Sequence, residues 1–119
     1  MSASRPLPGD RARWSNERMA FFAVITARGP NWDRGRGIRE QAYWAEHGAF
    51  ADALVQQGIV VFGGPVAVPD PDVIALIAVE ADDEEAARAA FAGDPWMKHG
   101  VFRLKEVWPW TIWLDGRHA

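Results

Sequence analysis

The chain has 119 residues, 49% of them hydrophobic, so it can bury the core of one ordinary domain and global disorder is excluded. The net charge of −3 argues against a nucleic-acid-binding module, which needs a basic surface. The absence of cysteine excludes disulfides, thiolate nucleophiles and zinc–thiolate sites. No apolar run approaches the roughly 20 residues that span a bilayer, so we expect no membrane partner.

Residues 1–18 predict an N-terminal extension, because they hold four arginines and two prolines and contribute little to a core. This extension is either a mobile tail or an arm that packs Trp14 on a neighbouring subunit. The domain proper is then residues 19–119. The apolar run 19–27 imitates a signal peptide, but its aromatic and β-branched residues favour a buried strand. We therefore expect a cytoplasmic location.

Six elements follow along the chain. They are strand, helix, strand, strand, helix and strand, predicted at residues 21–27, 41–57, 59–62, 73–79, 82–93 and 101–110. The apolar positions of the first helix step by three and four, and Gly58 ends it. Asp82 and Glu85 fit a capping box at the start of the second helix. Residues 94–96 are expected to form a sharp turn.

This order predicts an α+β fold: a ferredoxin-like βαββαβ protomer, with an antiparallel sheet and both helices on one face. In the last strand, period two places Phe102, Leu104, Trp108 and Trp110 together on one face, with Glu106 among them. The sheet face without helices would then be strongly apolar. A second copy of the chain is the simplest cover for it, so we expect a homodimer.

The residues from Met19 to about Trp110 resemble the YCII-related domain family. The matching features, in chain order, are His47 in the first helix, Gly58, Gly64-Pro65, Asp94-Pro95 followed by Trp96, Gly100, and Pro109-Trp110. The resemblance implies a dimeric α+β barrel with a site built from His47 and Asp94. This family includes a dehydrochlorinase that acts on a chlorinated hydroxyhydroquinone, and its fold relatives include muconolactone isomerases. Many members carry an arginine shortly before the histidine, where this chain has Trp44.

His47 is the titratable member of an otherwise apolar helix stripe. Periodicity alone favours a core histidine bonded to a backbone carbonyl or a tyrosine over a ligand-facing one. An ionised Asp94 would hold one imidazole N–H and fix the tautomer, which is the arrangement expected of a general base. We therefore predict His47 and Asp94 as the catalytic pair. Ordinary turn chemistry before a proline is the alternative for Asp94.

The predicted substrate-binding residues are glycines that let a ligand approach the backbone, the proline beside them, and aromatic side chains that could line a pocket. They are Gly63, Gly64, Pro65, Trp96, Trp44 and Phe22. A strand-end bulge and ordinary core packing are the structural alternatives. Arg34, Arg36 and Arg39 could attract a carboxylate or phenolate at the entrance, or form a solvated loop.

We expect no metal and no other cofactor. A metal site would need His47, His99 and His118 to converge with carboxylates, and no two of them have ligand spacing on one helix face. The Gly63-Gly64 pair is not a dinucleotide fingerprint, because no spaced third glycine opens a helix.

Three hypotheses for function follow. The first is a cofactor-independent lyase or isomerase, similar to the dehydrochlorinase or the muconolactone isomerases. Its His47–Asp94 pair would act as general acid/base on a small acid that is aromatic or enolisable. The second is a non-catalytic ligand-binding or accessory homodimer with the same pocket. The third is a structural dimer, in which the two residues bond each other inside a closed core. The sequence does not name the substrate or decide whether there is turnover.

Overall fold

The computed structural model describes residues 20–118. Its elements are β1 (Ala20–Arg28), a 3-10 turn η3 (Ile38–Glu40), α1 (Trp44–Gln56), β2 (Val60–Pro65), β3 (Val73–Ala81), α2 (Glu84–Ala89), α3 (Pro95–Lys98), β4 (Phe102–Trp110) and a 3-10 turn η4 (Gly116–His118). The predicted N-terminal extension, with Trp14, lies outside the described residues. In the described chain, no helix is long and apolar enough to cross a membrane.

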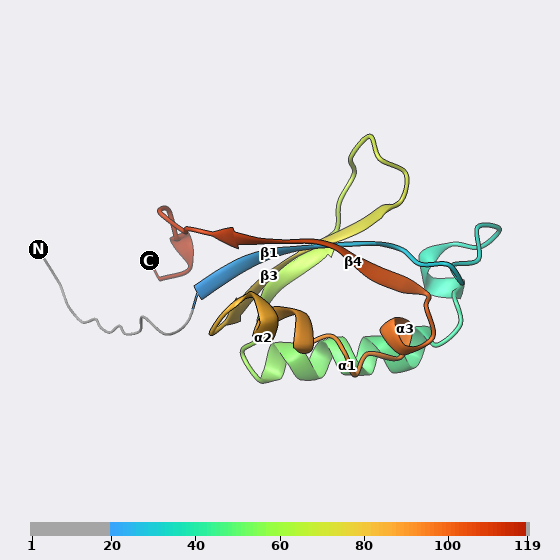
Figure 1. Cartoon of the computed structure of the whole chain (residues 1–119), viewed down its shortest axis with the longest axis horizontal. Helices are drawn as coiled ribbons and strands as arrows, with labels where there is room; N and C mark the ends of the chain where they lie inside the picture. Colours follow the sequence, from blue (N-terminus) through green and yellow to red (C-terminus); the bar gives the residue numbers. More distant parts are fainter. Residues whose placement is uncertain (1–19, 119) are drawn as a thin grey trace, which may run out of the picture.

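The four strands form one antiparallel sheet in the order β2-β3-β1-β4, and all three helices cover the same face of it (Figure 1). This is the α+β arrangement that the order of elements predicts, with β1 and β3 at the centre. The core lies between the sheet and the helices. Val24 of β1 and Val79 of β3 are fully buried there, and Leu54 of α1 and Phe91 pack on them from the helical layer.

The first helix is shorter than the predicted range 41–57. Tyr43 has the left-handed backbone angle φ of +64°, so α1 begins only at Trp44. Its end agrees with the prediction, because Gly58 has φ of +77°, a conformation that glycine adopts without strain. Because α1 begins at Trp44, His47 lies in its first turn, close to the loop that precedes the helix.

The second helical region differs from the prediction in two ways. Asp83, not Asp82, caps α2: its carboxylate accepts a hydrogen bond from the Ala86 backbone N–H at 2.8 Å, and the helix ends at Ala89 rather than near Gly93. The expected sharp turn at residues 94–96 is the start of a separate one-turn helix, α3, with Pro95 at its first position. Four residues are too few to show helical periodicity.

The predicted single face of the last strand is wrong. Ile25 of β1 pairs with Glu106 and Thr26 pairs with Leu104, so Lys105 is an extra residue in a β-bulge. A bulge exchanges the two faces for every residue beyond it. Phe102 and Leu104 therefore face the helices, whereas Glu106, Trp108 and Trp110 face the open side of the sheet.

The open side of the sheet carries large exposed apolar side chains. Phe62 of β2 and Trp108 of β4 are 54% and 53% exposed, and Trp110 is 37% exposed. Within residues 20–118, no α-helix lies on this side (Figure 1). Exposed aromatic side chains gathered on one face are typical of an interaction surface.

The C-terminal segment touches one end of this open side. The Arg117 guanidinium of η4 lies over the rings of Phe21 and Phe62, 5.3 and 5.9 Å from their centroids. A side-chain hydrogen bond to Asp115 raises the pKa of Arg117. Cation–π contacts of this kind are worth about 0.5–1 kcal/mol at exposed sites.

Candidate active site

His47 and Asp94 are brought together from α1 and from the start of α3, 47 residues apart. The His47 Nδ1 and Asp94 Oδ2 atoms are 2.8 Å apart. Asp94 is the N-cap of α3, where its Oδ1 accepts a hydrogen bond from the Trp96 backbone N–H, also at 2.8 Å. Both carboxylate oxygens are thus engaged, and only 2% of the side chain is exposed. The pair expected from the sequence is present with fixed geometry.

The hydrogen bond determines which imidazole nitrogen is free. An ionised carboxylate can only accept, so Nδ1 of His47 must be the donor. The other nitrogen, Nε2, has no hydrogen-bond partner within residues 20–118 and is not fully buried. A neutral His47 therefore presents an unprotonated, accessible nitrogen, which is what a general base requires.

Aromatic rings hold the imidazole in place. The Trp96 indole lies parallel to it, with ring centroids 3.9 Å apart and an interplanar angle of 3°. The Phe102 ring packs edge-on, with centroids 5.4 Å apart. Trp96 is itself anchored, because it is 1% exposed and its Nε1–H donates to the Ala42 carbonyl at 2.6 Å. The imidazole cannot rotate without displacing a buried tryptophan.

A cavity of about 510 Å³ opens beside this pair. It lies between α1 and the sheet, and aliphatic and aromatic side chains make up most of its wall. A closed core, which the purely structural hypothesis required, is therefore not found at this place. Of the eight predicted site residues, seven line the cavity: His47, Asp94, Gly63, Gly64, Pro65, Trp96 and Trp44. The eighth, Phe22, lies in the core between the sheet and the helices, 5% exposed.

The family model of the YCII-related domain matches residues 20–111. The chain belongs to the YCII-related domain family. The match covers every strand and helix of the sheet layer and the helical layer, and it contains both His47 and Asp94. No curated protein matches the chain.

Gly63 and Gly64, which both line the cavity of this YCII-related domain, have different surroundings. Both lie within β2, which extends to Pro65 rather than ending at residue 62 as predicted. A Cβ at Gly63 would lie 3.0 Å from the Ile77 Cα, so this glycine allows β2 and β3 to pair closely. A Cβ at Gly64 would meet nothing within 4 Å. Gly64 pairs with Leu76, which in turn pairs with Ile25, so this free space lies on the open side of the sheet and not in the cavity.

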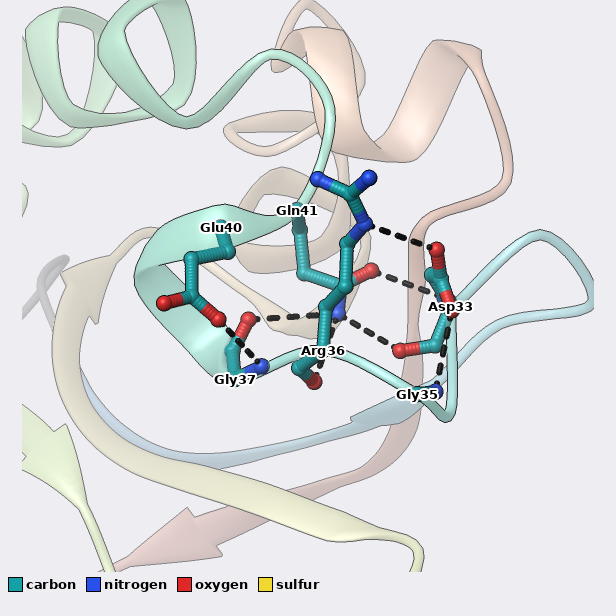
Figure 2. Close-up of polar contacts among 6 residues, drawn as sticks. All are labelled: Asp33, Gly35, Arg36, Gly37, Glu40 and Gln41. Atoms are coloured by element: carbon teal, nitrogen blue, oxygen red, sulfur yellow. Dashed lines mark hydrogen bonds and ion pairs between the residues drawn. The ribbon is translucent and has the colours of Figure 1, made fainter.

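The loop before α1 folds around the side chain of Gln41, which is 4% exposed (Figure 2). Its Oε1 accepts from the Asp33 backbone N–H at 2.8 Å, and its Nε2 donates to the carbonyls of Asp33, Arg36 and Gly37 at 2.8, 3.1 and 3.2 Å. The loop is therefore an ordered wall, and it carries Ile38 into the cavity lining. Gln41 was not among the residues predicted from the sequence to form the site.

The arginines of this loop do not enter the site. Arg34 pairs with Asp72 at 3.2 Å, and Arg36 pairs with Asp33 at 3.3 Å. Both side chains are more than 60% exposed. Among the described residues, no arginine or lysine lines the cavity.

Thr26 and Phe102 also line the cavity, although neither was predicted from the sequence as a site residue. Phe102 is the edge-on neighbour of His47. Thr26 is a lone hydroxyl in the strand sequence Ala20–Arg28, and its alternation with Phe22 and Val24 was a signal that it faces the helices. Within residues 20–118, no group of three or more histidine, aspartate or glutamate side chains is placed to hold a metal ion.

Proposed function

We propose that the protein is a cofactor-independent enzyme of the lyase or isomerase type, in which His47 acts as general acid/base and Asp94 orients it. One observation carries this proposal: a histidine with one nitrogen fixed by a buried carboxylate and the other accessible lies in the wall of a 510 Å³ apolar cavity. The substrate is a small aromatic or enolisable molecule, which is what such a cavity accommodates.

The reaction begins when Nε2 of His47 takes a proton from a carbon next to a carbonyl, or from a ring hydroxyl. The electron pair left behind is delocalised as an enolate or phenolate. In an isomerisation, the imidazolium returns the proton to a different carbon. In an elimination, the electron pair expels a leaving group such as chloride, and the proton stays on His47 until solvent removes it. Asp94 stabilises the imidazolium in both cases.

Solvent exchange tests the proton transfer even where the final product has not been identified. The protein is incubated in D₂O with a panel of chlorinated hydroxyquinols, muconolactones and β-keto esters, and deuterium incorporation and chloride release are followed by NMR and ion chromatography. We expect His47→Ala to lower the rate about 10²- to 10⁴-fold, the usual contribution of a positioned base. The rate of the unaltered protein should fall at acidic pH, because a protonated imidazole accepts no further proton. An unchanged rate in His47→Ala would refute the assignment.

The same experiment separates the enzyme from a binding protein. A non-catalytic binding domain would give chemical-shift changes with a panel member and no exchange above the background rate. The affinity of such a binding domain for its ligand would change with pH, but no exchange rate above the background would be measured at any pH.

We also propose that the enzyme is a homodimer joined through the open side of the sheet. Support comes from the exposed aromatic side chains on that side, Phe62, Trp108 and Trp110, and from the absence of any described helix over it. Sedimentation equilibrium should give twice the chain mass, and Trp108→Lys should shift the equilibrium towards the monomer by burying an unpaired charge. Lys98→Glu on the helical side is the control. Monomeric wild-type protein at micromolar concentration would contradict the proposal.

A further inference from the structure

Thr26 carries a buried hydroxyl that the fold does not use. The residue lies in the middle of the central strand β1, on the side that faces the helices, and is 0% exposed. Its Oγ1 has no hydrogen-bond partner among the described residues. Buried hydroxyl groups in folded proteins are nearly always paired, so this one requires an explanation.

The sheet is irregular on both sides of this residue. The pairing with β4 shifts register between Ile25 and Thr26, where Lys105 is the extra residue. The pairing with β3 shifts between Thr26 and Ala27, where Ile74 is the extra residue. Bulges of this kind redirect side chains and are common beside active sites. Here they bracket the one threonine of the strand, and Ile74 lines the cavity together with it.

Thr26 lines the same cavity as His47. It lies at the floor, where its hydroxyl has almost no accessible surface. A threonine side chain has one rotatable torsion, so a ligand can recruit the hydroxyl through a change of a single rotamer.

The charge of the cavity limits which ligand can reach this floor. Asp52 and Asp94 are the charged residues of the described lining, and both are acidic. Among residues 20–118, no lysine or arginine lies in the lining to pair with an anion. A carboxylate entering an apolar cavity without a cation loses its hydration without compensation. A neutral molecule with an apolar body does not bear this cost.

We infer that Thr26 is a specificity-determining residue, whose hydroxyl hydrogen-bonds a polar group at the inner end of a neutral, largely apolar ligand. This rests on the proposed function, since it deepens the role of the same cavity, and it restricts the small aromatic or enolisable substrate to a neutral compound that bears a hydroxyl or carbonyl group. His47 reacts with the ligand, and Thr26 selects it.

Three probes of matched size test the inference: 2-naphthol, naphthalene and naphthalene-2-carboxylate. Dissociation constants are measured by NMR titration of the ¹⁵N-labelled full chain, with the Gly64 amide and the Trp96 indole N–H as reporters of the cavity. We expect 2-naphthol to bind about three- to tenfold more tightly than naphthalene, the value of one neutral hydrogen bond. The carboxylate should bind at least tenfold more weakly than 2-naphthol.

Two variants assign this preference to the hydroxyl. Thr26→Val keeps the shape and should abolish the preference for 2-naphthol over naphthalene, whereas Thr26→Ser should retain it. The melting temperature of Thr26→Val should stay equal or rise, because an unpartnered hydroxyl is removed. A preference unchanged in Thr26→Val, or a melting temperature lowered by more than about 5 °C, would overturn the inference. The second result would show that the hydroxyl is bonded within the protein.

The probes also distinguish this inference from the proposed function. A carboxylate that binds more tightly than 2-naphthol, or 2-naphthol shifts that spare both reporters, would overturn the ligand class while leaving proton transfer by His47 open. A preference for 2-naphthol over naphthalene that depends on Thr26 would support the inference. If His47→Ala left the deuterium exchange rate of the same protein unchanged, the proposed enzymatic function would be refuted.

Discussion

Replacing Asp94 by asparagine tests the tautomer of His47 on which the proposed chemistry depends. The carboxylate accepts two hydrogen bonds, one from the Trp96 backbone N–H and one from His47 Nδ1. An asparagine carbonyl can keep the first. Its amide group then faces Nδ1 as a donor, so Nδ1 must become the acceptor and the proton must move to Nε2. The variant presents a donor to the cavity in place of a base.

The cost to stability follows from the same two bonds. A hydrogen bond to a charged group contributes about 1.5–3 kcal/mol and a neutral one about 0.5–1.5 kcal/mol, so each of the two bonds weakens by about 1–1.5 kcal/mol. Asp94→Asn should therefore lower the free energy of unfolding by about 2–3 kcal/mol. Asp94→Ala also removes the cap of α3, worth about 1 kcal/mol, and leaves the buried Nδ1 side of His47 unpaired. We expect a loss of about 3–5 kcal/mol for Asp94→Ala. Turnover should fall in both variants.

Long-range ¹H–¹⁵N correlation spectra of the imidazole measure the tautomer directly. At neutral pH the wild type should show a protonated Nδ1 and an unprotonated Nε2, and Asp94→Asn the reverse. Urea titration gives the two stabilities. A wild type with its proton on Nε2, or an Asp94→Asn variant with the wild-type tautomer, would refute the reasoning. Equal stability losses for the two variants would show that losing the α3 cap in Asp94→Ala adds no cost beyond losing the charged hydrogen bond.

Three further substitutions test the scaffold, each followed by urea titration. Gly29→Ala places a Cβ 2.3 Å from the Gly100 carbonyl oxygen and should lower the free energy of unfolding by about 2 kcal/mol or more. A urea midpoint equal to that of the wild type would contradict the close approach of these two glycines. A Cβ at Gly48 in α1 would meet nothing within 4 Å, so Gly48→Ala should raise the free energy of unfolding by about 0.5–1 kcal/mol. A lower free energy of unfolding would show that the new methyl group clashes with its surroundings. Gln41→Ala breaks four hydrogen bonds and should cost about 2–3 kcal/mol, and native-state hydrogen exchange should quicken in residues 33–41; unchanged exchange would show that the loop is held elsewhere.

Hydrophobic periodicity was sufficient for the larger elements. The steps of three and four in residues 41–57 predicted α1, and the order of strands and helices predicted that the helices share one face of the sheet. Gly58 was correctly placed as the end of the helix, because glycine tolerates the left-handed conformation. His47 and Asp94 were paired through the family resemblance, since periodicity alone favoured a core histidine.

The features that periodicity missed depend on contacts between distant segments. A bulge changes the face of a strand without changing its sequence pattern, so Trp108 was assigned to the side of Phe102. The role of Gln41 depends on carbonyls that converge only when the loop is closed. Thr26 was visible as a polar residue in an apolar strand, but its lack of a partner is a property of the packed fold.

The bulge at Lys105 divides β4 into two halves whose large side chains lie on opposite sides of the sheet. Before the bulge, Phe102 packs on His47 in the cavity wall, and after it, Trp108 and Trp110 lie on the open side of the sheet. A substitution in one half therefore acts on a different side of the sheet from a substitution in the other. Deletion of Lys105 would leave Leu104 opposite Thr26 and Glu106 opposite Ile25, so the pairing would become regular and both halves of β4 would keep their present faces.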